Sequence, residues 1–324
     1  MALSKENRAT RQPLPRYRQS GQESPALVLQ ERDVKLLEEV WRYRLLTTSH
    51  IELLRSLDPD PELRFVSRLT LTRRLKLLYH HKYLQRIARP LSKGSLEPVY
   101  VLDSRGAALL SRQHSGVTAH TADLARNGAA LKHCLEVVQV RVALAAACGR
   151  SSLAEVLQWQ DAEEVKFSAQ IAPTGARKRK VSVLPDGFFA LRVAPQRFFY
   201  FLQIDSRGET PQALADTCNG YYSYWQSGGF ARDFTVPPAV GFRVLFIAPT
   251  PKRVEAILSA ARSLNAGHAL FWVTTQEHIT PQQILNPIWH GCASGQLTSI
   301  LGTDKNTLAE SETEKGDRDA SGPY

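Results

Sequence analysis

Three helical segments followed by a hairpin, all within residues 29–113, constrain the fold more than any other feature of this sequence. Apolar residues recur at helical spacing in the first two segments. Each of these segments begins at residues that can cap a helix, Asp33 for the first and Thr47 or Thr48 for the second. The spacing therefore predicts two short helices, each with one buried face.

A third helix is expected over residues 62–79, where Val66 and Leu69 belong to the apolar set. Two short extended runs follow, at residues 84–88 and 98–102, and a turn that contains a glycine separates them. Three helices and then a hairpin is the order of a winged helix-turn-helix, so we predict that fold for the N-terminal third of the chain.

The stretch from residue 63 to residue 96 contains no acidic side chain. A solvated helix usually mixes both signs of charge, because oppositely charged neighbours stabilise it. Positive charge alone on a helix and a hairpin is typical of contact with phosphates. The candidate DNA-binding residues are Arg64, Arg68, Thr70, Thr72, Arg73, Arg74, Lys76, Lys82, Arg86, Arg89 and Lys93. The alternative interpretation is a basic, solvated surface on a small helical domain.

The charge of the whole chain agrees with a polyanionic partner. Its 324 residues have a formal net charge of +10, which favours nucleic acid over a membrane surface. The longest apolar stretch, residues 134–148, is too short and too charged to span a bilayer. The four cysteines show no metal-binding spacing and are expected to be buried thiols in a reducing compartment. We therefore expect a cytoplasmic protein with no membrane partner.

The chain length suggests two domains with tails. After the first folded region, the pattern of a helix, two adjacent strands and then alternating helix and strand predicts a mixed sheet flanked by helices, hence an α/β (α+β) class. The expected divisions are a flexible basic arm at 1–28, the winged helix at 29–113, a linker at 114–127, the α/β domain at 128–295 and a disordered tail at 296–324.

Several segments resemble the replication-relaxation family. They are ERDVKLLEEVWRYRLLTTSHIELL, LTRRLKLLYHHKYLQRI and PVYVLDSRGAALL in the first region, and LPDGFFAL, FFYFLQIDSRGET and the tyrosines of residues 221–224 in the second. The resemblance covers about residues 29–265. It implies a winged-helix N-terminus and a role in the mobilisation, relaxation or replication control of plasmids and other mobile elements. It also suggests a relaxase or replication protein as a partner, and a homodimer.

Part of the second region is similar to the core motif of restriction endonucleases, in which an Asp and a Glu hold magnesium beside a Lys. Asp186 fits the first position, but Gln203 replaces the acid and Asp205 stands where the Lys is needed. Glu136 could supply a further carboxylate, and Lys178 or Lys180 the cation. An active metal site would require several of these substitute residues to come together. We therefore predict a nuclease-like domain without activity and without a cofactor. In that case, Asp186 turns the chain into a strand and Asp205 caps the next helix.

Other catalytic classes lack their motifs. The sequence contains neither a phosphate-binding loop of the G-x-x-x-x-G-K-[ST] type nor a G-x-S-x-G elbow. Tyr221, Tyr222 and Tyr224 are reminiscent of a relaxase nucleophile, but no H-x-H motif accompanies them. Tyr221 and Trp225 are one helical turn apart and are expected to pack a core, with stacking on single-stranded bases as the alternative.

These patterns predict a DNA-binding protein that serves as a mobilisation accessory or as a transcriptional regulator. The competing function is a metal-dependent endonuclease, which nicks DNA with the second domain and requires Mg²⁺.

Overall fold

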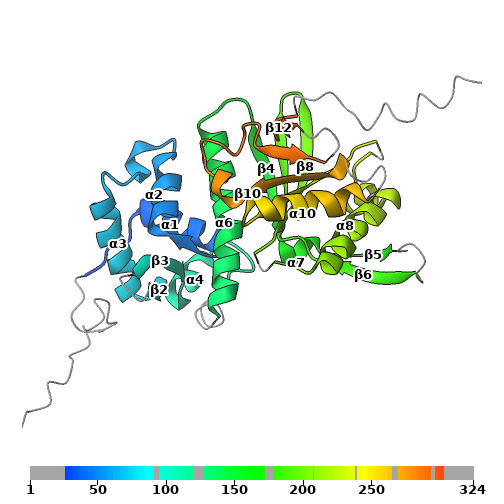
Figure 1. Cartoon of the computed structure of the whole chain (residues 1–324). Helices are drawn as coiled ribbons and strands as arrows, with labels where there is room; N and C mark the ends of the chain where they lie inside the picture. Colours follow the sequence, from blue (N-terminus) through cyan, green and yellow to red (C-terminus); the bar gives the residue numbers. More distant parts are fainter. Residues whose placement is uncertain are drawn as a thin grey trace, which may run out of the picture. The chain divides into compact units, whose positions relative to one another are not determined.

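The computed structural model describes residues 26–90, 95–119, 127–171, 178–206, 208–237, 239–264, 269–292 and 296–302. The chain divides into two compact units, Met1–Arg126 and Asn127–Tyr324, called the first and second unit below (Figure 1). None of the described helices has the length and apolar character needed to cross a membrane.

The first unit combines helices with one small antiparallel sheet. Its elements are α1 (Glu31–Arg42), β1 (Leu46–Thr47), α2 (Thr48–Ser56), a 3-10 turn (Pro61–Leu63), α3 (Arg68–His80), β2 (Leu84–Pro90), β3 (Ser95–Leu102) and α4 (Ser104–Leu110). The strand order is β1-β3-β2. The three helices and the hairpin therefore occur in the predicted order, and the hairpin strands are longer than predicted.

Two helix starts differ from the prediction. Gln30 precedes α1, and Asp33, expected as the cap, is instead the third residue, whose carboxylate accepts the Gln30 N–H at 2.7 Å. The expected helix over residues 62–79 is broken, because Ser67 caps a new start by accepting the Thr70 N–H at 3.2 Å. Helix α3 is therefore shorter than predicted, and Val66 lies outside it.

The core of the first unit forms where α1 and α3 cover the sheet. Leu36 and Leu37 of α1 are fully buried, as are Leu71 and Leu75 of α3. Gly106 in α4 allows close packing, because a Cβ at this position would lie 2.3 Å from the Tyr83 carbonyl oxygen.

The second unit is a mixed sheet covered by helices on both faces, which is the predicted α/β class. Its helices are α6 (Gly128–Gly149), α7 (Ala162–Val165), α8 (Pro211–Gln226), α9 (Gly229–Phe234) and α10 (Pro251–Arg262). The strands of the main sheet are β4 (Glu155–Asp161), β7 (Gly187–Val193), β8 (Gln196–Ile204), β9 (Arg243–Ala248), β10 (Phe271–Thr275), β11 (Trp289–Gly291) and β12 (Leu297–Thr298). A 3-10 turn, Gln276–His278, follows β10.

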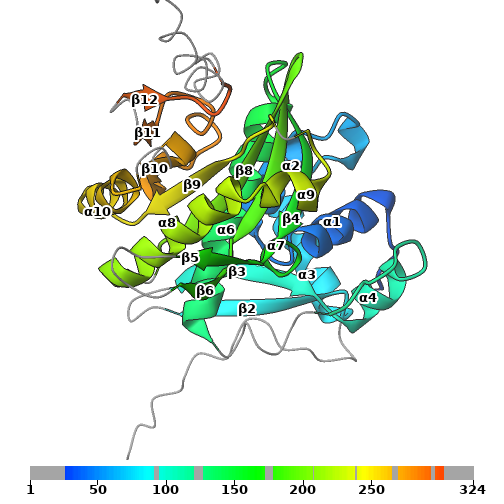
Figure 2. The same ribbon diagram turned by 90° about the vertical axis from the view of Figure 1, so that its right-hand side faces the viewer.

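The main sheet has seven strands in the order β12-β11-β10-β9-β8-β7-β4 (Figure 2). Strands β8, β9 and β10 are parallel, and the other pairs are antiparallel. Alternate residues of β8 face opposite layers: Tyr200 packs with Leu144 of α6, whereas Phe201 packs with Tyr221 of α8 and Ile257 of α10. The two cores thus hold the ends of the central strands rigidly, which positions the polar residues that follow them.

A separate two-stranded sheet lies outside the main sheet. Its strands are β5 (Phe167–Ile171) and β6 (Arg179–Val183), and β6 contains Arg179 and Lys180 of the basic run. Valine side chains on β6 face α8, so packing and not the basic composition determines the strand.

The start of the predicted disordered tail is also wrong. Within the expected tail, 296–324, Leu297 and Thr298 form β12, and Ile300 is fully buried. The Tyr200 hydroxyl donates to the Ile300 carbonyl oxygen at 2.6 Å, which anchors this segment. Residues 303–324 lie outside the described residues, as do residues 1–25 of the predicted arm and 120–126 of the predicted linker.

All four cysteines are free thiols. Cys218 and Cys292 are buried as predicted, whereas Cys134 and Cys148 are only half-buried. Burial raises the pKa of the Cys148 thiol to about 11 and that of Cys292 to about 12, so both stay protonated near neutral pH.

Candidate nucleic-acid interface and carboxylate cluster

Helix α3 has one buried and one exposed face. Leu71, Leu75 and Leu78 are fully buried. The residues on the opposite side of the helix, Leu69, Arg73 and Lys76, are exposed. The exposed face therefore combines two cations with an apolar side chain. Such a face can contact a partner that carries both negative charges and apolar groups.

The apolar part of this face is larger than the sequence suggested. Leu69 is 60% exposed, and Val66, just before the helix, is 94% exposed. Both belonged to the apolar set of the predicted third helix, whose start was placed too early. Exposed aliphatic side chains beside exposed cations are candidates for contact with a partner.

The remaining candidate cations differ in their partners. Arg73 and Lys82 make no side-chain hydrogen bond or ion pair with any described residue. Arg64 is exposed, and its Nε donates to the Asp58 carbonyl oxygen at 2.7 Å. Arg86 is half-buried, as is Arg89, whose guanidinium donates weakly to a carbonyl oxygen of β3 at 3.4 Å. Lys93, in the hairpin turn, lies outside the described residues.

Arg74, one of the candidate DNA-binding residues, is half-buried and paired with an acid of the first unit. Its Nε donates to Oδ1 of Asp33 at 2.6 Å, and its Nη2 forms an ion pair with the same carboxylate. A further hydrogen bond of 2.7 Å reaches the Val28 carbonyl oxygen. Asp33 is fully buried, so Arg74 neutralises a core carboxylate and ties α3 to α1.

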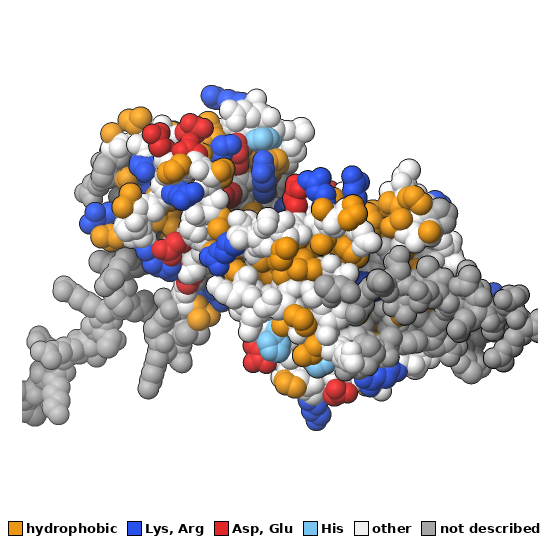
Figure 3. All heavy atoms as spheres, turned by 90° about the horizontal axis from the view of Figure 1, so that it is seen from above, with side chains coloured by type: hydrophobic (Ala, Val, Ile, Leu, Met, Phe, Trp, Pro, Cys, Tyr) orange, Lys and Arg blue, Asp and Glu red, His pale blue; other side chains and the backbone are white. Residues whose placement is uncertain are grey.

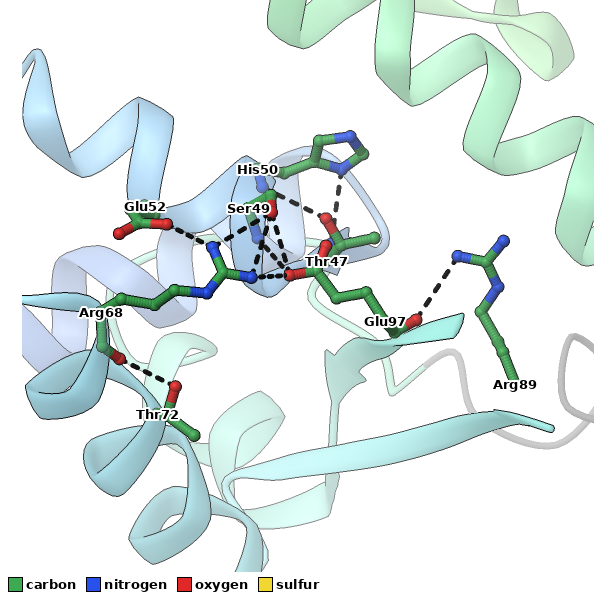
Figure 4. A network of polar contacts seen from close by, with 8 residues as sticks. All are labelled: Thr47, Ser49, His50, Glu52, Arg68, Thr72, Arg89 and Glu97. Atoms are coloured by element: carbon green, nitrogen blue, oxygen red, sulfur yellow. Dashed lines mark hydrogen bonds and ion pairs between the residues drawn. The ribbon is translucent and has the colours of Figure 1, made fainter. Parts of the chain in front are cut away.

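Arg68 is exposed but also has acidic partners, in a network of polar contacts that Figure 4 shows. Its guanidinium pairs with Glu52 of α2 and Glu97 of β3, and donates to the Ser49 Oγ at 3.2 Å. The hydrogen bond to Glu52 raises the pKa of Arg68 above its ordinary value. Arg68 thus connects α2, α3 and the hairpin. Like Arg74, it is a cation of the acid-free stretch that is neutralised by acids from outside that stretch.

The two candidate threonines serve the helix itself. The Thr70 hydroxyl lies 3.0 Å from the Ser67 Oγ at the helix start, and the Thr72 hydroxyl donates to the Arg68 carbonyl oxygen at 2.8 Å. In the space-filling view, acidic and basic side chains are interspersed over the first unit, so the side of it that is seen there does not carry positive charge alone (Figure 3).

In the second unit, Asp186 and Glu136 meet through two residues that the sequence did not single out. Asp186 accepts the Ile204 N–H at 2.6 Å, and its other oxygen lies 2.8 Å from the His133 Nε2. The His133 Nδ1 is 2.8 Å from the Ser206 Oγ, which donates to Glu136. One imidazole and one hydroxyl thus connect the two carboxylates.

Asp205 faces a cation that the sequence also did not predict. Arg253 of α10 forms an ion pair with this buried carboxylate, and the Glu209 N–H donates to it at 3.2 Å. Burial and then the nearby Asp205 charge raise the pKa of Glu209, while Arg253 lowers it. Asp205 does not cap α8, since the side chain of Thr210 does so.

The Gln203 side chain also has a hydrogen-bond partner. Its side-chain oxygen accepts a hydrogen bond of 3.1 Å from the buried hydroxyl of Tyr221. Burial raises the pKa of Tyr221 well above its ordinary value, which keeps this phenol protonated. Tyr221 lies in the core as predicted, and Tyr224 is buried beside it. Trp225, also expected in the core, is only half-buried and stacks on Tyr222 with ring centroids 5.8 Å apart.

Among the described residues, no group of three or more His, Cys, Asp or Glu side chains converges as metal ligands do. Lys178 and Lys180, proposed as cations for a nuclease site, form no ion pair with the described carboxylates and are exposed around β6. A sequence signal did exist for His133, which lies one turn before Glu136 on the same helix. Arg253 had none, because only the fold brings it to Asp205.

Comparisons with known proteins give a family and a weak structural similarity. The family model described as replication-relaxation matches residues 37–239. No curated protein matches the sequence. Among solved structures, the restriction endonuclease FokI is similar over 80% of this chain and 46% of its own length, with 14% sequence identity and a TM-score of 0.30. The chain thus spans about half the length of that enzyme, and a similarity at this TM-score carries no conclusion about activity.

Proposed function

This chain belongs to the replication-relaxation family, and from that premise we propose that it binds duplex DNA through its first unit. The binding serves the replication or mobilisation of a plasmid or another mobile element, as an accessory protein or as a transcriptional regulator. The order α1-β1-α2-α3-β2-β3 and the antiparallel sheet β1-β3-β2 support a winged helix. In that assignment, α3 is the recognition helix and the β2–β3 hairpin is the wing.

The exposed face of α3 is the observation that carries this proposal. Arg73 has no anionic partner among the described residues, and Lys76 is exposed one turn further on. Phosphates supply a counter-charge for Arg73, and their neutralisation releases condensed cations from DNA. Leu69 and Val66 then face the groove, where an apolar side chain contacts the thymine methyl group.

Arg68 and Arg74 have a different role in this proposal. Since their guanidinium groups are held by Glu52, Glu97 and Asp33, they set the position of α3 relative to α1, α2 and the hairpin. A recognition helix held in this way presents its exposed face without rearrangement, which lowers the entropic cost of binding.

The second unit, we propose, does not hydrolyse DNA. Arg253 already neutralises Asp205, and Gln203 is bonded to Tyr221. Asp186 is bonded to the Ile204 N–H and lies against His133, while Glu136 accepts the Ser206 hydroxyl. A divalent cation would have to displace several of these partners to gain the hard oxygen ligands it needs.

A metal-dependent endonuclease is the second candidate function. It is favoured by the proximity of acidic groups, because the charges of Asp205 and Asp186 both contribute to raising the pKa of Glu209. Incubation of the protein with supercoiled DNA and Mg²⁺ or Mn²⁺ decides between the two. Nicking that disappears in a folded Asp186→Ala variant would establish the endonuclease and refute an inactive second unit.

A gel-shift experiment tests the main proposal. The full-length protein is titrated against duplexes from the intergenic DNA of its own genetic element, with and without Mg²⁺. We expect retarded, intact duplex in both conditions. No shift of any duplex at low salt would refute DNA binding.

The family also suggests a relaxase or replication protein as a partner, and a homodimer, and both stay predictions. Light scattering of the free protein and of its DNA complex measures the number of chains per duplex. Two chains on a site with two-fold symmetry would support the homodimer.

A further inference from the structure

The β5–β6 ribbon of the second unit has two chemically different faces. The antiparallel register places Ser168 opposite Ser182 and Gln170 opposite Lys180. Because side chains alternate along a strand, these four residues share one face, and the residues between them share the other.

The inner face is packed against α8, which fixes the ribbon in place (Figures 1 and 2). Ala169, Ile171 and Val183 are buried on this side. Gly220 of α8 makes the contact close, since a Cβ there would lie 2.4 Å from a Val183 methyl carbon. The Ser223 hydroxyl donates to the Gln170 carbonyl oxygen at 2.6 Å.

The charged side chains of the ribbon also differ between its two faces. Arg179, next to the inner face, forms an ion pair with Asp216 of α8. Lys178 and Lys180 are exposed and make no side-chain hydrogen bond or ion pair with any described residue. The outer face carries Ser168, Gln170, Lys180 and Ser182, all exposed, and no acidic residue of the two strands lies on it.

We propose that this outer face is a second DNA-binding surface, which contacts the phosphate backbone of a duplex without reading its sequence. Lys, Ser and Gln are side chains that bind phosphate oxygens in protein–DNA complexes. Lys178 directly precedes β6 and Lys180 is its second residue, so the two cations are close enough to reach the same strand of DNA.

This inference rests on the proposed function, because it assigns further contacts with the same ligand. It adds that the second unit contributes affinity for the duplex without sequence preference. The competing explanation is that the lysines only protect the ribbon edges from pairing with other chains, as exposed edge lysines do.

The test uses the full-length protein and a pair of charge-matched double variants. Lys178→Gln with Lys180→Gln removes the two cations next to the ribbon. The control, Arg197→Gln with Lys252→Gln, removes two exposed cations elsewhere in the second unit. Fluorescence anisotropy measures the affinity of each protein for two unrelated duplexes of equal length across a range of salt concentrations, and thermal melting verifies that both variants stay folded.

We expect the ribbon variant to bind both duplexes several-fold more weakly, by the same factor. Its log–log salt slope should be smaller by about 0.9 for each phosphate that the variant no longer neutralises. If the wild type binds DNA and the ribbon variant matches the control in affinity and slope, the ribbon proposal is wrong and the proposed function stands. If the wild type binds no duplex, both fail. Weaker binding to only one of the two duplexes would also overturn the proposal, since phosphate contacts carry no base information.

Discussion

Arg74 of α3 and Asp33 of α1 form a buried ion pair across 41 residues of sequence. Asp33 is fully buried, and Arg74 satisfies it with two guanidinium nitrogens. The adjacent Arg73 points away from the core and is exposed. Two consecutive arginines of one basic stretch thus have opposite roles, one in the core of the first unit and one on the proposed DNA interface.

This difference predicts that replacing Arg74 destabilises the first unit and that replacing Arg73 does not. Arg74→Ala leaves the Asp33 carboxylate buried without its cation, which should cost about 3 kcal/mol of unfolding free energy. Arg73→Ala, the matched control on the same helix, should stay within about 0.5 kcal/mol of the wild type. Denaturant unfolding measures both. Equal stabilities of the two variants would contradict the buried pair.

Glu39 of α1 should make the stability of the first unit depend on pH. Burial raises the pKa of this carboxyl from 4.5 to about 7, although Arg55 lies 2.8 Å away and lowers it. The folded state then retains a proton that the unfolded chain loses, so stability is full below about pH 4.5 and decreases as the pH rises to about 7.

A Glu39→Gln variant isolates this contribution, because it cannot ionise. The stability difference between the variant and the wild type should shift in favour of the variant between pH 5 and pH 8, by at most about 3 kcal/mol. Melting curves over this range measure the difference. A difference that is constant with pH would show that Glu39 does not retain the proton.

Asp205 should be required for folding of the second unit. Asp205→Ala leaves Arg253 without its carboxylate, and the resulting destabilisation should be about 3 kcal/mol. Replacing both partners, with Asp205→Leu and Arg253→Met, should restore part of this stability, because an apolar pair needs no desolvated charges. If the double variant were as unstable as the sum of the two single variants, the pair would not be the source of the effect.

Leu69 should influence which sequence is bound more than whether DNA is bound. The side chain is 60% exposed, so Leu69→Ala should leave the melting temperature nearly unchanged. The substitution should reduce the preference for the best duplex by about 1 kcal/mol, because contacts with base edges carry sequence information. A selection from random duplexes, repeated with the variant, measures this; an identical set of selected sequences would argue against Leu69 facing the groove.

Local patterns predicted the elements well, because helices and hairpins depend on neighbouring residues. The cap at Thr47 and the hairpin β2–β3 follow from spacing and turn residues. The start of α3 was predicted too early, since a 3-10 turn and the cap at Ser67 interrupt an apolar pattern that looks continuous.

The candidate sites were less predictable, because charge balance is set in space and not along the sequence. The acid-free stretch indicated that its basic residues from Arg64 to Lys93 contact phosphates. Asp33, Glu52 and Glu97 neutralise two of them from outside the stretch. Likewise Arg253, in a different helix, supplies the cation next to Asp205 that the motif lacked.

The salt dependence of duplex binding by an Arg73→Gln, Lys76→Gln variant tests the central proposal most directly. The control with Arg197→Gln and Lys252→Gln removes the same charge outside α3. If α3 contacts the DNA backbone, the variant should bind more weakly than the control, and its log–log salt slope should be smaller by up to about 1.8, because two phosphates are no longer neutralised. An affinity and a slope equal to those of the control would show that the exposed face of α3 does not bind DNA.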